Sequence, residues 1–242
     1  MQLHRCFVLA AFLSAGHAAT PKPASTANFV EPLRPYVQNV SATLQKVPED
    51  RKALLDQIAV TAYDLLSSGK EANMTFICTH NSRRSHMSQI WAQTAACFYG
   101  LDRVYAYSGG TEETACNSRT VAAMRRAGFS IVKATEGDNP VYLVQFSDEH
   151  PPIRAFSKLY NADGNLAQGF IALMTCSQAD KTCPKVEGAV ARYAIHYVDP
   201  KMCDDTPDEP VAYNERCLEI AREMFYIMAR LRELIDTNAS KQ

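Results

Sequence analysis

Apolar residues recur every three or four positions in two stretches near the start of the chain. In the first stretch they are Leu33, Val37, Val40 and Leu44, and in the second they are Leu54, Ile58, Ala62 and Leu65. This spacing places each set on one face of a helix. A polar break over residues 47–50 separates the two stretches. The pattern therefore predicts an N-terminal helical hairpin, whose second helix ends at Gly69.

Short apolar runs alternate with helical patterns from residue 74 onward. The runs predict buried strands over residues 74–77, 104–108, 129–133 and 170–174. Helices are predicted over residues 85–99, 117–127 and 211–235, the second of them capped by Asn117. This alternation predicts an α/β fold, with a parallel sheet and helices on both faces. Residues 141–153 fit the alternation poorly, and we predict that they form an inserted strand pair.

The first eighteen residues have the three parts of a secretory signal peptide. A basic start that includes Arg5 precedes an apolar run over residues 6–15, and small residues follow up to Ala19. About ten apolar residues are half of what a bilayer span needs, so a membrane anchor is the weaker interpretation. We predict cleavage near Ala18 and export to a periplasmic or secreted location. The alternative is an N-terminal segment that is retained.

Composition limits the partners of the chain. With 242 residues, 47% of them hydrophobic, the chain can bury one core of good size. Its formal net charge of −1 gives no electrostatic footprint for nucleic acid or for an anionic membrane surface. We expect neither as a partner once the signal peptide is removed. Any recognition of an anion must therefore be local.

The cysteine count leaves an odd number in the mature chain. Loss of the signal peptide removes Cys6 and leaves seven cysteines. In an oxidising compartment at least one thiol is then unpaired, or paired between chains. Cys78 is the candidate for this free thiol. Cys203 and Cys217 are candidates for a disulfide, although the sequence does not fix the pairing.

The segment Cys-Thr-His-Asn-Ser-Arg-Arg-Ser at residues 78–85 joins a predicted strand to a predicted helix. Backbone amides at a helix N-terminus hold anions, and they favour the thiolate form of a nearby cysteine. Arg84 is placed to grip two oxygens, Ser85 to donate a hydrogen bond to the thiolate, and Asn81 to hold the loop by bonding its own backbone. We predict that the Cys78 thiolate attacks a tetrahedral anion; the alternative is an inert buried cysteine. The residues expected to bind the oxyanion are Thr79, His80, Asn81, Ser82, Arg83 and Arg84.

These residues resemble the active-site loop of the low-molecular-weight protein tyrosine phosphatases and of the thioredoxin-coupled arsenate reductases that share their fold. The resemblance spans roughly residues 73–235. Within this span it includes the segments at residues 107–112, 173–184 and 198–200. It implies a four-stranded parallel sheet flanked by helices, and it implies that Asp199 is the general acid. The chain then divides into a signal peptide (1–18), an N-terminal linker and helical extension (19–72) and a catalytic domain (73–237).

Two cysteines separate the functions that such a loop can serve. Cys176 and Cys183 fall where the arsenate reductases have their two redox cysteines, which implies a relay from Cys78 and a thioredoxin-like reductant. Asp199 is followed by Pro200-Lys201-Met202, without the tyrosines of the phosphatases. We therefore favour an arsenate reductase over a phosphatase that acts on phosphoesters. A structural disulfide between Cys176 and Cys183 is an alternative, because export makes disulfides ordinary.

Two further expectations follow from the loop and its cysteines. We expect no cofactor and no metal, because the spacing of Cys176 and Cys183 is not that of a zinc site and no histidine follows at ligand distance. The resemblance places a glycine where this chain has His80, which is unfavourable if the backbone is left-handed there. Arg83 stands where many relatives have a second loop cysteine.

An exported module that binds anions without turnover is a further alternative.

Overall fold

The computed structural model describes residues 29–240, so the predicted signal peptide lies outside the described residues. The α-helices are α1 (Arg34–Ser41), α2 (Glu49–Ser67), α3 (Arg84–Phe98), α4 (Ser118–Arg126), α5 (Ser177–Thr182) and α6 (Glu209–Ala239). The strands are β1 (Ala72–Cys78), β2 (Val104–Gly110), β3 (Ser130–Lys133), β4 (Tyr142–Gln145), β5 (Ile153–Ala155), β6 (Phe170–Met174) and β7 (Ala189–Ala194). Short 3₁₀ turns lie at Glu31–Leu33, Leu44–Lys46 and Pro200–Cys203.

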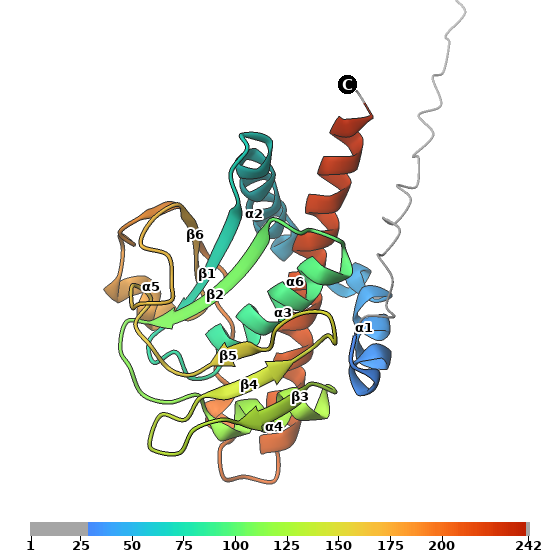
Figure 1. Cartoon of the computed structure of the whole chain (residues 1–242). Helices are drawn as coiled ribbons and strands as arrows, with labels where there is room; N and C mark the ends of the chain where they lie inside the picture. The colour runs from blue at the N-terminus through green and yellow to red at the C-terminus, as the bar shows by residue number, and fades with distance from the viewer. Residues whose placement is uncertain (1–28, 241–242) are drawn as a thin grey trace, which may run out of the picture.

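A four-stranded parallel sheet in the order β2-β1-β6-β7 organises the chain, which confirms the predicted fold class (Figure 1). Every residue of β1 is buried, as expected for a central strand covered on both faces. Successive side chains of a strand point to opposite faces. Phe76 therefore joins the large core with α3 and α6, while Ile77 joins a smaller core with α5. Cys78 ends the strand within the smaller core.

The predicted strand over residues 129–133 forms, but its assignment to the parallel sheet is wrong. β3 belongs to a separate antiparallel sheet, β3-β4-β5, which also contains the predicted inserted strand pair. Only Ile131 of β3 is buried and Val132 is 60% exposed, the pattern of a sheet with one solvated face. The fourth parallel strand is instead β7, which the apolar pattern missed. Ala189, Ala191 and Arg192 are only half-buried, and Ala194 is exposed, at the edge of the sheet.

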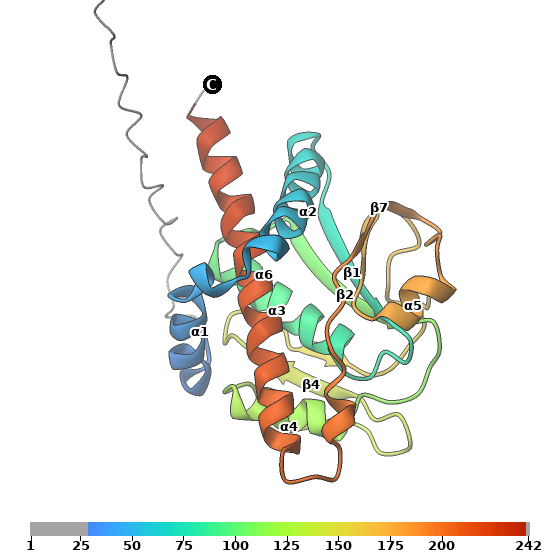
Figure 2. The ribbon, with the colours of Figure 1, turned by 180° about the vertical axis from the view of Figure 1, so that it is seen from behind.

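Both predicted N-terminal helices form, and their packing makes them part of the large core. The main contacts of α1 are to α6, and α2 contacts α6, β1 and β7 (Figure 2). They therefore lie along α6 rather than forming a hairpin packed on itself. The predicted C-terminal helix is confirmed as α6, and its stripe from Tyr213 to Leu231 is buried. In the described part of the chain, no helix is both long and apolar enough to cross a membrane.

This packing predicts that the catalytic region does not fold without the N-terminal helices. A chain that begins at Glu71 loses six fully buried large side chains, Phe29, Leu33, Val37, Val40, Leu55 and Ile58. At about 2 kcal/mol for each side chain, the loss approaches the whole stability of an ordinary domain. We expect this truncated chain to show no cooperative thermal transition in circular dichroism. A chain that begins at Ala19 is the control. A cooperative transition in the shorter chain would contradict the conclusion that the catalytic region needs the N-terminal helices to fold.

Candidate active site

The loop between β1 and α3 is held by its carbonyl groups, which are turned toward neighbouring segments. The carbonyl oxygens of Cys78 and Thr79 accept hydrogen bonds from the amides of Thr111, at 3.1 Å, and Glu112, at 2.8 Å. The His80 carbonyl accepts from the hydroxyl groups of Thr114 and Ser157, at 3.1 and 2.8 Å. The Ser82 carbonyl accepts from the amide of Asn117 at 3.0 Å. The residues after β2 thus surround the outer side of the loop.

The amide groups of the same loop are available to a ligand. Within residues 29–240, none of the backbone amides of residues 79–85 donates a hydrogen bond to the protein. Buried backbone donors are nearly always satisfied, so a run of unpaired amides at a helix N-terminus indicates a site for an anion. The predicted strand-loop-helix arrangement is present, with β1 ending at Cys78 and α3 beginning at Arg84.

Gly110 lets the outer segment approach the loop closely. It pairs with Cys78 across β1 and β2. A Cβ atom at this position would lie 2.7 Å from the carbonyl oxygen of Thr79 and 2.9 Å from the amide nitrogen of Asn81. Any larger residue would therefore push the loop outward, and this requirement for glycine is a feature of the site that the motif alone does not reveal.

The predicted contact between nucleophile and serine is present. The Cys78 sulfur is 3.1 Å from the Ser85 hydroxyl, and Ser85 also accepts a hydrogen bond from the Asn81 amide group at 2.9 Å. The Asn81 side-chain oxygen accepts from the backbone amide of Lys158 at 3.1 Å. The expectation that Asn81 bonds its own backbone is therefore wrong. Asn81 is also the left-handed residue of the loop, with φ of 43°, so the concern about His80 does not apply.

Arg84 and Asp199 meet, although 115 positions separate them in the sequence. Arg84 donates one hydrogen bond to the Asp199 carboxylate at 2.6 Å and another to the Tyr197 carbonyl at 2.9 Å. Its Nε is buried and has no acceptor among the described residues. Asp199 also accepts from the amide of Lys201 at 3.1 Å, which fixes the turn that follows. The guanidinium so held keeps a buried donor without a protein partner among the described residues.

A buried network that the sequence did not reveal supports Arg84 from behind. Tyr197 donates from its hydroxyl to Glu223 of α6 at 2.7 Å, and Arg51 of α2 donates to the same carboxylate at 2.8 and 2.6 Å. The Arg51 guanidinium also lies 5.5 Å from the centre of the Tyr197 ring. Burial first, and then the charge of Glu223, raises the pKa of Tyr197. The N-terminal extension therefore contacts the residue whose carbonyl orients Arg84.

The side chains of the other predicted oxyanion-binding residues point elsewhere. Arg83 donates to the Tyr213 hydroxyl at 2.7 Å and to Asp204 at 3.1 Å, so its side chain has protein partners, and its part in binding the oxyanion stays a prediction. Ser82 donates to the Ala115 carbonyl at 2.7 Å. His80 is half-exposed and lies 3.3 Å from the Glu112 carboxylate. Within residues 29–240, the backbone amides of these residues and of Thr79 donate no hydrogen bond to the protein, and Arg84 keeps a buried Nε donor without a protein partner.

Cys176 lies against the loop, while Cys183 lies beyond it. The Cys176 sulfur is 3.5 Å from the Thr79 hydroxyl and accepts a hydrogen bond from the Ala179 amide at 3.4 Å, as the N-cap of α5. Cys183 is at the other end of α5, half-buried. All seven cysteines of the described chain are free thiols. The suggested disulfide from Cys203 to Cys217 is not formed, because Cys217 is buried and accepts from the Trp91 ring nitrogen at 3.2 Å.

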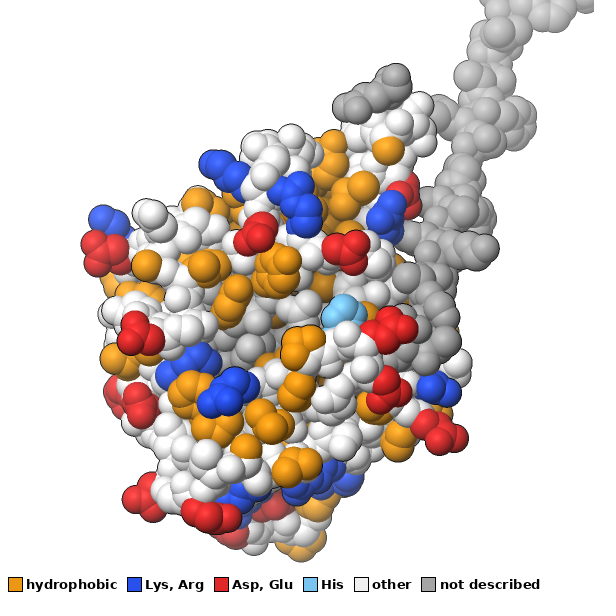
Figure 3. Space-filling model, viewed as in Figure 1, with side chains coloured by type: hydrophobic (Ala, Val, Ile, Leu, Met, Phe, Trp, Pro, Cys, Tyr) orange, Lys and Arg blue, Asp and Glu red, His pale blue; other side chains and the backbone are white. Residues whose placement is uncertain are grey.

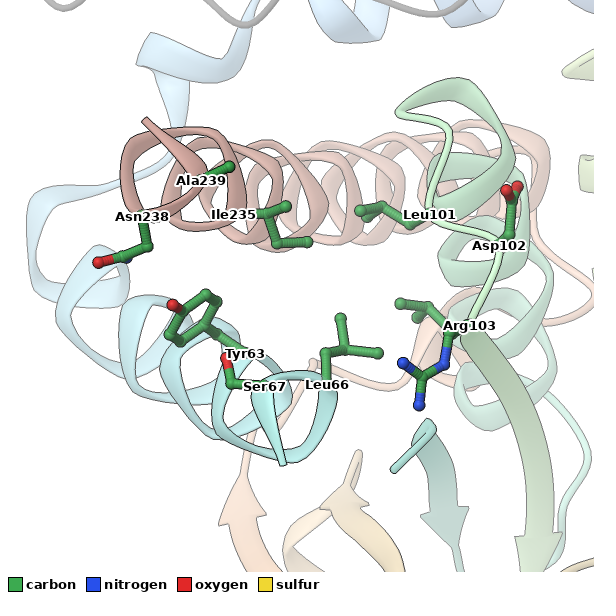
Figure 4. Close-up of a pocket in the computed structure, with 10 residues that line it drawn as sticks. Tyr63, Leu66, Ser67, Leu101, Asp102, Arg103, Ile235, Asn238 and Ala239 are labelled. Atoms are coloured by element: carbon green, nitrogen blue, oxygen red, sulfur yellow. The ribbon is translucent and has the colours of Figure 1, made fainter. Parts of the chain in front are cut away.

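The cleft drawn in Figure 4 is a different place. It has a volume of about 400 Å³ and lies between α2, α6 and the start of β2, with Leu66, Leu101 and Ile235 on its walls. Val104, the first residue of β2, lines it, whereas the loop follows the last residue of the parallel neighbour β1. The cleft therefore lies at the opposite end of the parallel strands from the loop. None of its lining residues is a cysteine or histidine.

Comparisons with known proteins agree with this geometry. The family model described as low molecular weight phosphotyrosine protein phosphatase matches residues 73–138. The arsenate reductase of Bacillus licheniformis is 30% identical over 141 residues, which are 58% of this chain and 83% of that protein. The arsenate reductase of Bacillus subtilis is 28% identical over 141 residues, with the same shares of the two chains.

Solved structures of the same kind align at lower similarity. The low molecular weight phosphotyrosine phosphatase from Vibrio cholerae has a TM-score of 0.43 at 11% identity, and the alignment covers 70% of this chain and 98% of that one. An arsenate reductase in the phosphate binding state has a TM-score of 0.32 at 17% identity, with the same coverage. The fold described above rests on the strand order and register of this chain itself.

The sequence match and the loop define a cysteine-based enzyme, either a phosphatase or an arsenate reductase. The chain belongs to the low-molecular-weight phosphotyrosine protein phosphatase superfamily, near the arsenate reductases.

The network behind Arg84 predicts that Arg51 supports anion binding from a distance. Arg51→Met leaves the buried Glu223 carboxylate without its partner, and breaking such a pair costs about 3 kcal/mol of folding stability. Adding Glu223→Gln removes the stranded charge, so we expect the double variant to recover most of the stability. It should not recover affinity for orthophosphate, because the contact of Arg51 with the Tyr197 ring is still missing.

Calorimetric titration with orthophosphate and thermal unfolding measure the two effects separately. The matched control is Lys52→Met, which removes a half-buried lysine whose partner is Glu49 on the same helix. Affinity that returns together with stability in the double variant would mean that Arg51 acts on the fold alone.

Proposed function

We propose that this enzyme is an arsenate reductase in which Cys78, Cys176 and Cys183 act in turn. One observation carries the proposal: the Cys176 sulfur lies 3.5 Å from the hydroxyl of Thr79, the residue next to the nucleophile. Cys78 and Cys176 share one small core cluster, and Cys183 packs against it. A phosphatase has no chemical use for a second and third cysteine at this place. The sequence similarity to arsenate reductases supports the same choice.

The first step is a displacement at arsenic. The Cys78 thiolate attacks the arsenic atom of arsenate, an S–As bond forms, and one As–O bond breaks. The free amides of the loop and the Arg84 guanidinium hold the oxygens that remain on arsenic, where preorganised donors are most effective. Ser85 stabilises the sulfur as a thiolate through its hydroxyl, which lies 3.1 Å away.

Asp199 supplies the proton to the departing oxygen. It accepts a hydrogen bond from Arg84 in the free enzyme. An oxyanion that binds in the loop competes for the same guanidinium donors and releases the carboxyl group. A general acid must lie within hydrogen-bond reach of the leaving atom, and its place beside Arg84 gives Asp199 that reach.

The remaining steps move two electrons to arsenic. The Cys176 thiolate attacks the Cys78 sulfur, and an S–S bond forms. The S–As bond breaks, its electron pair stays on arsenic, and the arsenic leaves as arsenite. The Cys183 thiolate then attacks Cys176, closes a second disulfide and releases Cys78 as a thiolate. A thioredoxin-like dithiol reductant restores Cys176 and Cys183 by the same exchange reaction.

The last exchange requires α5 to open. Cys176 and Cys183 cap the two ends of this helix, which places their Cα atoms about 10 Å apart at 1.5 Å per residue. A disulfide needs a Cα separation of about 7 Å or less. A standing structural disulfide is therefore incompatible with the helix. Arg192 of β7 bonds both the Asp180 side chain and the Cys183 carbonyl, so opening α5 breaks a clamp on its C-terminal end.

Cys176→Ser separates the two activities that the loop supports. We expect this variant to lose the production of arsenite from arsenate with a thioredoxin system, because no sulfur remains to attack Cys78. Hydrolysis of an aryl phosphate should persist, since it needs only Cys78, Arg84 and Asp199. Both rates are measured on the purified mature protein. Cys78→Ser should lose both activities, and Cys97→Ser, which removes a cysteine outside the relay, is the control.

Equal loss of both activities in Cys176→Ser would make that cysteine structural. A wild-type enzyme that hydrolyses the aryl phosphate but turns over no arsenate would make the chain a phosphatase instead.

We also propose that the enzyme is exported, from the signal-like pattern of its first eighteen residues. The dithiol reductant must then be one that works outside the cytosol. When the full chain is expressed in a bacterial host, we expect the periplasmic protein to begin at Ala19. Mass spectrometry of the intact protein measures its N-terminus, and an uncleaved cytosolic product would overturn the proposal.

A further inference from the structure

A second cavity lies between β2 and the inserted strand β5. Figure 3 shows it as a hollow on the face of the molecule that carries these strands. Its volume is about 580 Å³, within the range of small-molecule sites. Aromatic and proline side chains form much of its wall: Tyr105, Tyr107, Phe146, Pro151, Pro152 and Phe156. Residues 146–165 supply most of this lining, and none of the lining residues belongs to the nucleophile loop at residues 78–85.

Lys158 lines this cavity and lacks a partner for its charge. The residue is only 7% exposed. Among residues 29–240, no carboxylate pairs with its ammonium group and no acceptor is recorded for it; the group lies 4.7 Å from the centre of the Phe156 ring. A buried charge without a counterion costs free energy, and burial lowers the pKa of Lys158 to about 8. A group of this kind is a ready partner for an anion.

The other titratable groups around Lys158 leave the cavity positive. Arg154, His150 and Asp163 also line it. Cys116 and the buried His86 lie behind Lys158, and burial together with the Lys158 charge lowers the pKa of His86 to about 3, so His86 is neutral. Two cations, Lys158 and Arg154, therefore face one carboxylate near neutral pH. The aromatic wall favours a flat apolar body on the ligand.

We propose that this cavity binds a small aromatic anion, with its carboxylate against Lys158 and its ring against the aromatic wall. Lys158 also connects this site to the catalytic loop. The backbone amide of Lys158 donates to Asn81, and its carbonyl accepts from the amide of Gly110 at 2.8 Å. A ligand that shifts Lys158 therefore acts on two residues that shape the anion cradle.

Pyridoxal 5′-phosphate is a suitable probe, because it is an aromatic anion whose aldehyde condenses with a neutral amine and releases water. Borohydride then reduces the imine, and peptide mass spectrometry locates the label. Burial lowers the pKa of Lys158, so a larger share of its amine is neutral near pH 7.5 than in an ordinary lysine. We expect Lys158 to be labelled roughly tenfold faster than Lys133, an exposed lysine on β3 of the same small sheet.

Benzoate tests the class of ligand. It has the ring and the carboxylate but no aldehyde, so it should protect Lys158 saturably and leave the labelling of Lys133 unchanged. Arg154→Gln removes an exposed cation without touching the core, and it should weaken this protection several-fold, whereas Lys133→Met should not. Failure to label Lys158 in the folded protein would mean that the cavity is closed to such ligands. Labelling without protection by benzoate, or equal protection in Arg154→Gln, would overturn the proposed ligand.

Discussion

The site depends on the hydrogen bonds that the loop carbonyls accept from residues outside the loop. A peptide unit has its carbonyl and its amide on opposite sides, so a partner that fixes one of them also directs the other. The amides of Thr111, Glu112 and Asn117 take three of these carbonyls, and two hydroxyl groups take a fourth. The amides of residues 79–85 are left without protein partners in the part of the chain that the structure describes. The anion cradle is thus made as much by the residues that follow β2 as by the motif itself.

Segments outside the recognisable motif hold the parts that the motif supplies. α2 and α6 support Tyr197 through Arg51 and Glu223, and the Tyr197 carbonyl orients Arg84. The insert reaches the loop from the other side, where Ser157 bonds the His80 carbonyl and Lys158 bonds Asn81. The insert therefore contacts the loop directly, whereas the N-terminal helices reach Arg84 only through Tyr197. This explains why the N-terminal helices share one core with the sheet instead of forming a separate unit.

The sequence was informative where chemistry or periodicity is local. It predicted the loop between β1 and α3, the cap at Asn117 and the apolar face of α6, because each signal lies within a few turns of chain. It misplaced β3, since a four-residue apolar run does not say which sheet it joins. It missed β7, whose alternating alanines and Arg192 lack the apolar residues of a buried strand.

The roles of single loop residues were harder to predict than the loop. Arg83 and Arg84 are adjacent and chemically equal, but only Arg84 faces Asp199, while Arg83 turns to Tyr213 and Asp204. The difference is set where α3 begins, because Arg84 is the first residue of the helix, whereas Arg83 precedes it with a non-helical backbone. The support of Tyr197 by Arg51 and Glu223 left no local signal at all, since 172 positions separate the two charged residues.

The same loop can begin either reaction of the superfamily, so the choice between them must lie after the first displacement. A thiolate bound to phosphorus is released by water, whereas a thiolate bound to arsenic can also be released by a second thiolate, because arsenic accepts the electron pair. That second route needs a sulfur at the edge of the cradle, where Cys176 lies. It also needs a third sulfur that arrives only when α5 opens, since α5 keeps Cys183 away from Cys176. A six-residue helix is marginal without its tertiary contacts, so opening it costs little beyond the bonds made by Arg192. In the proposed reductase, the stability of α5 therefore sets how readily the third sulfur enters the relay.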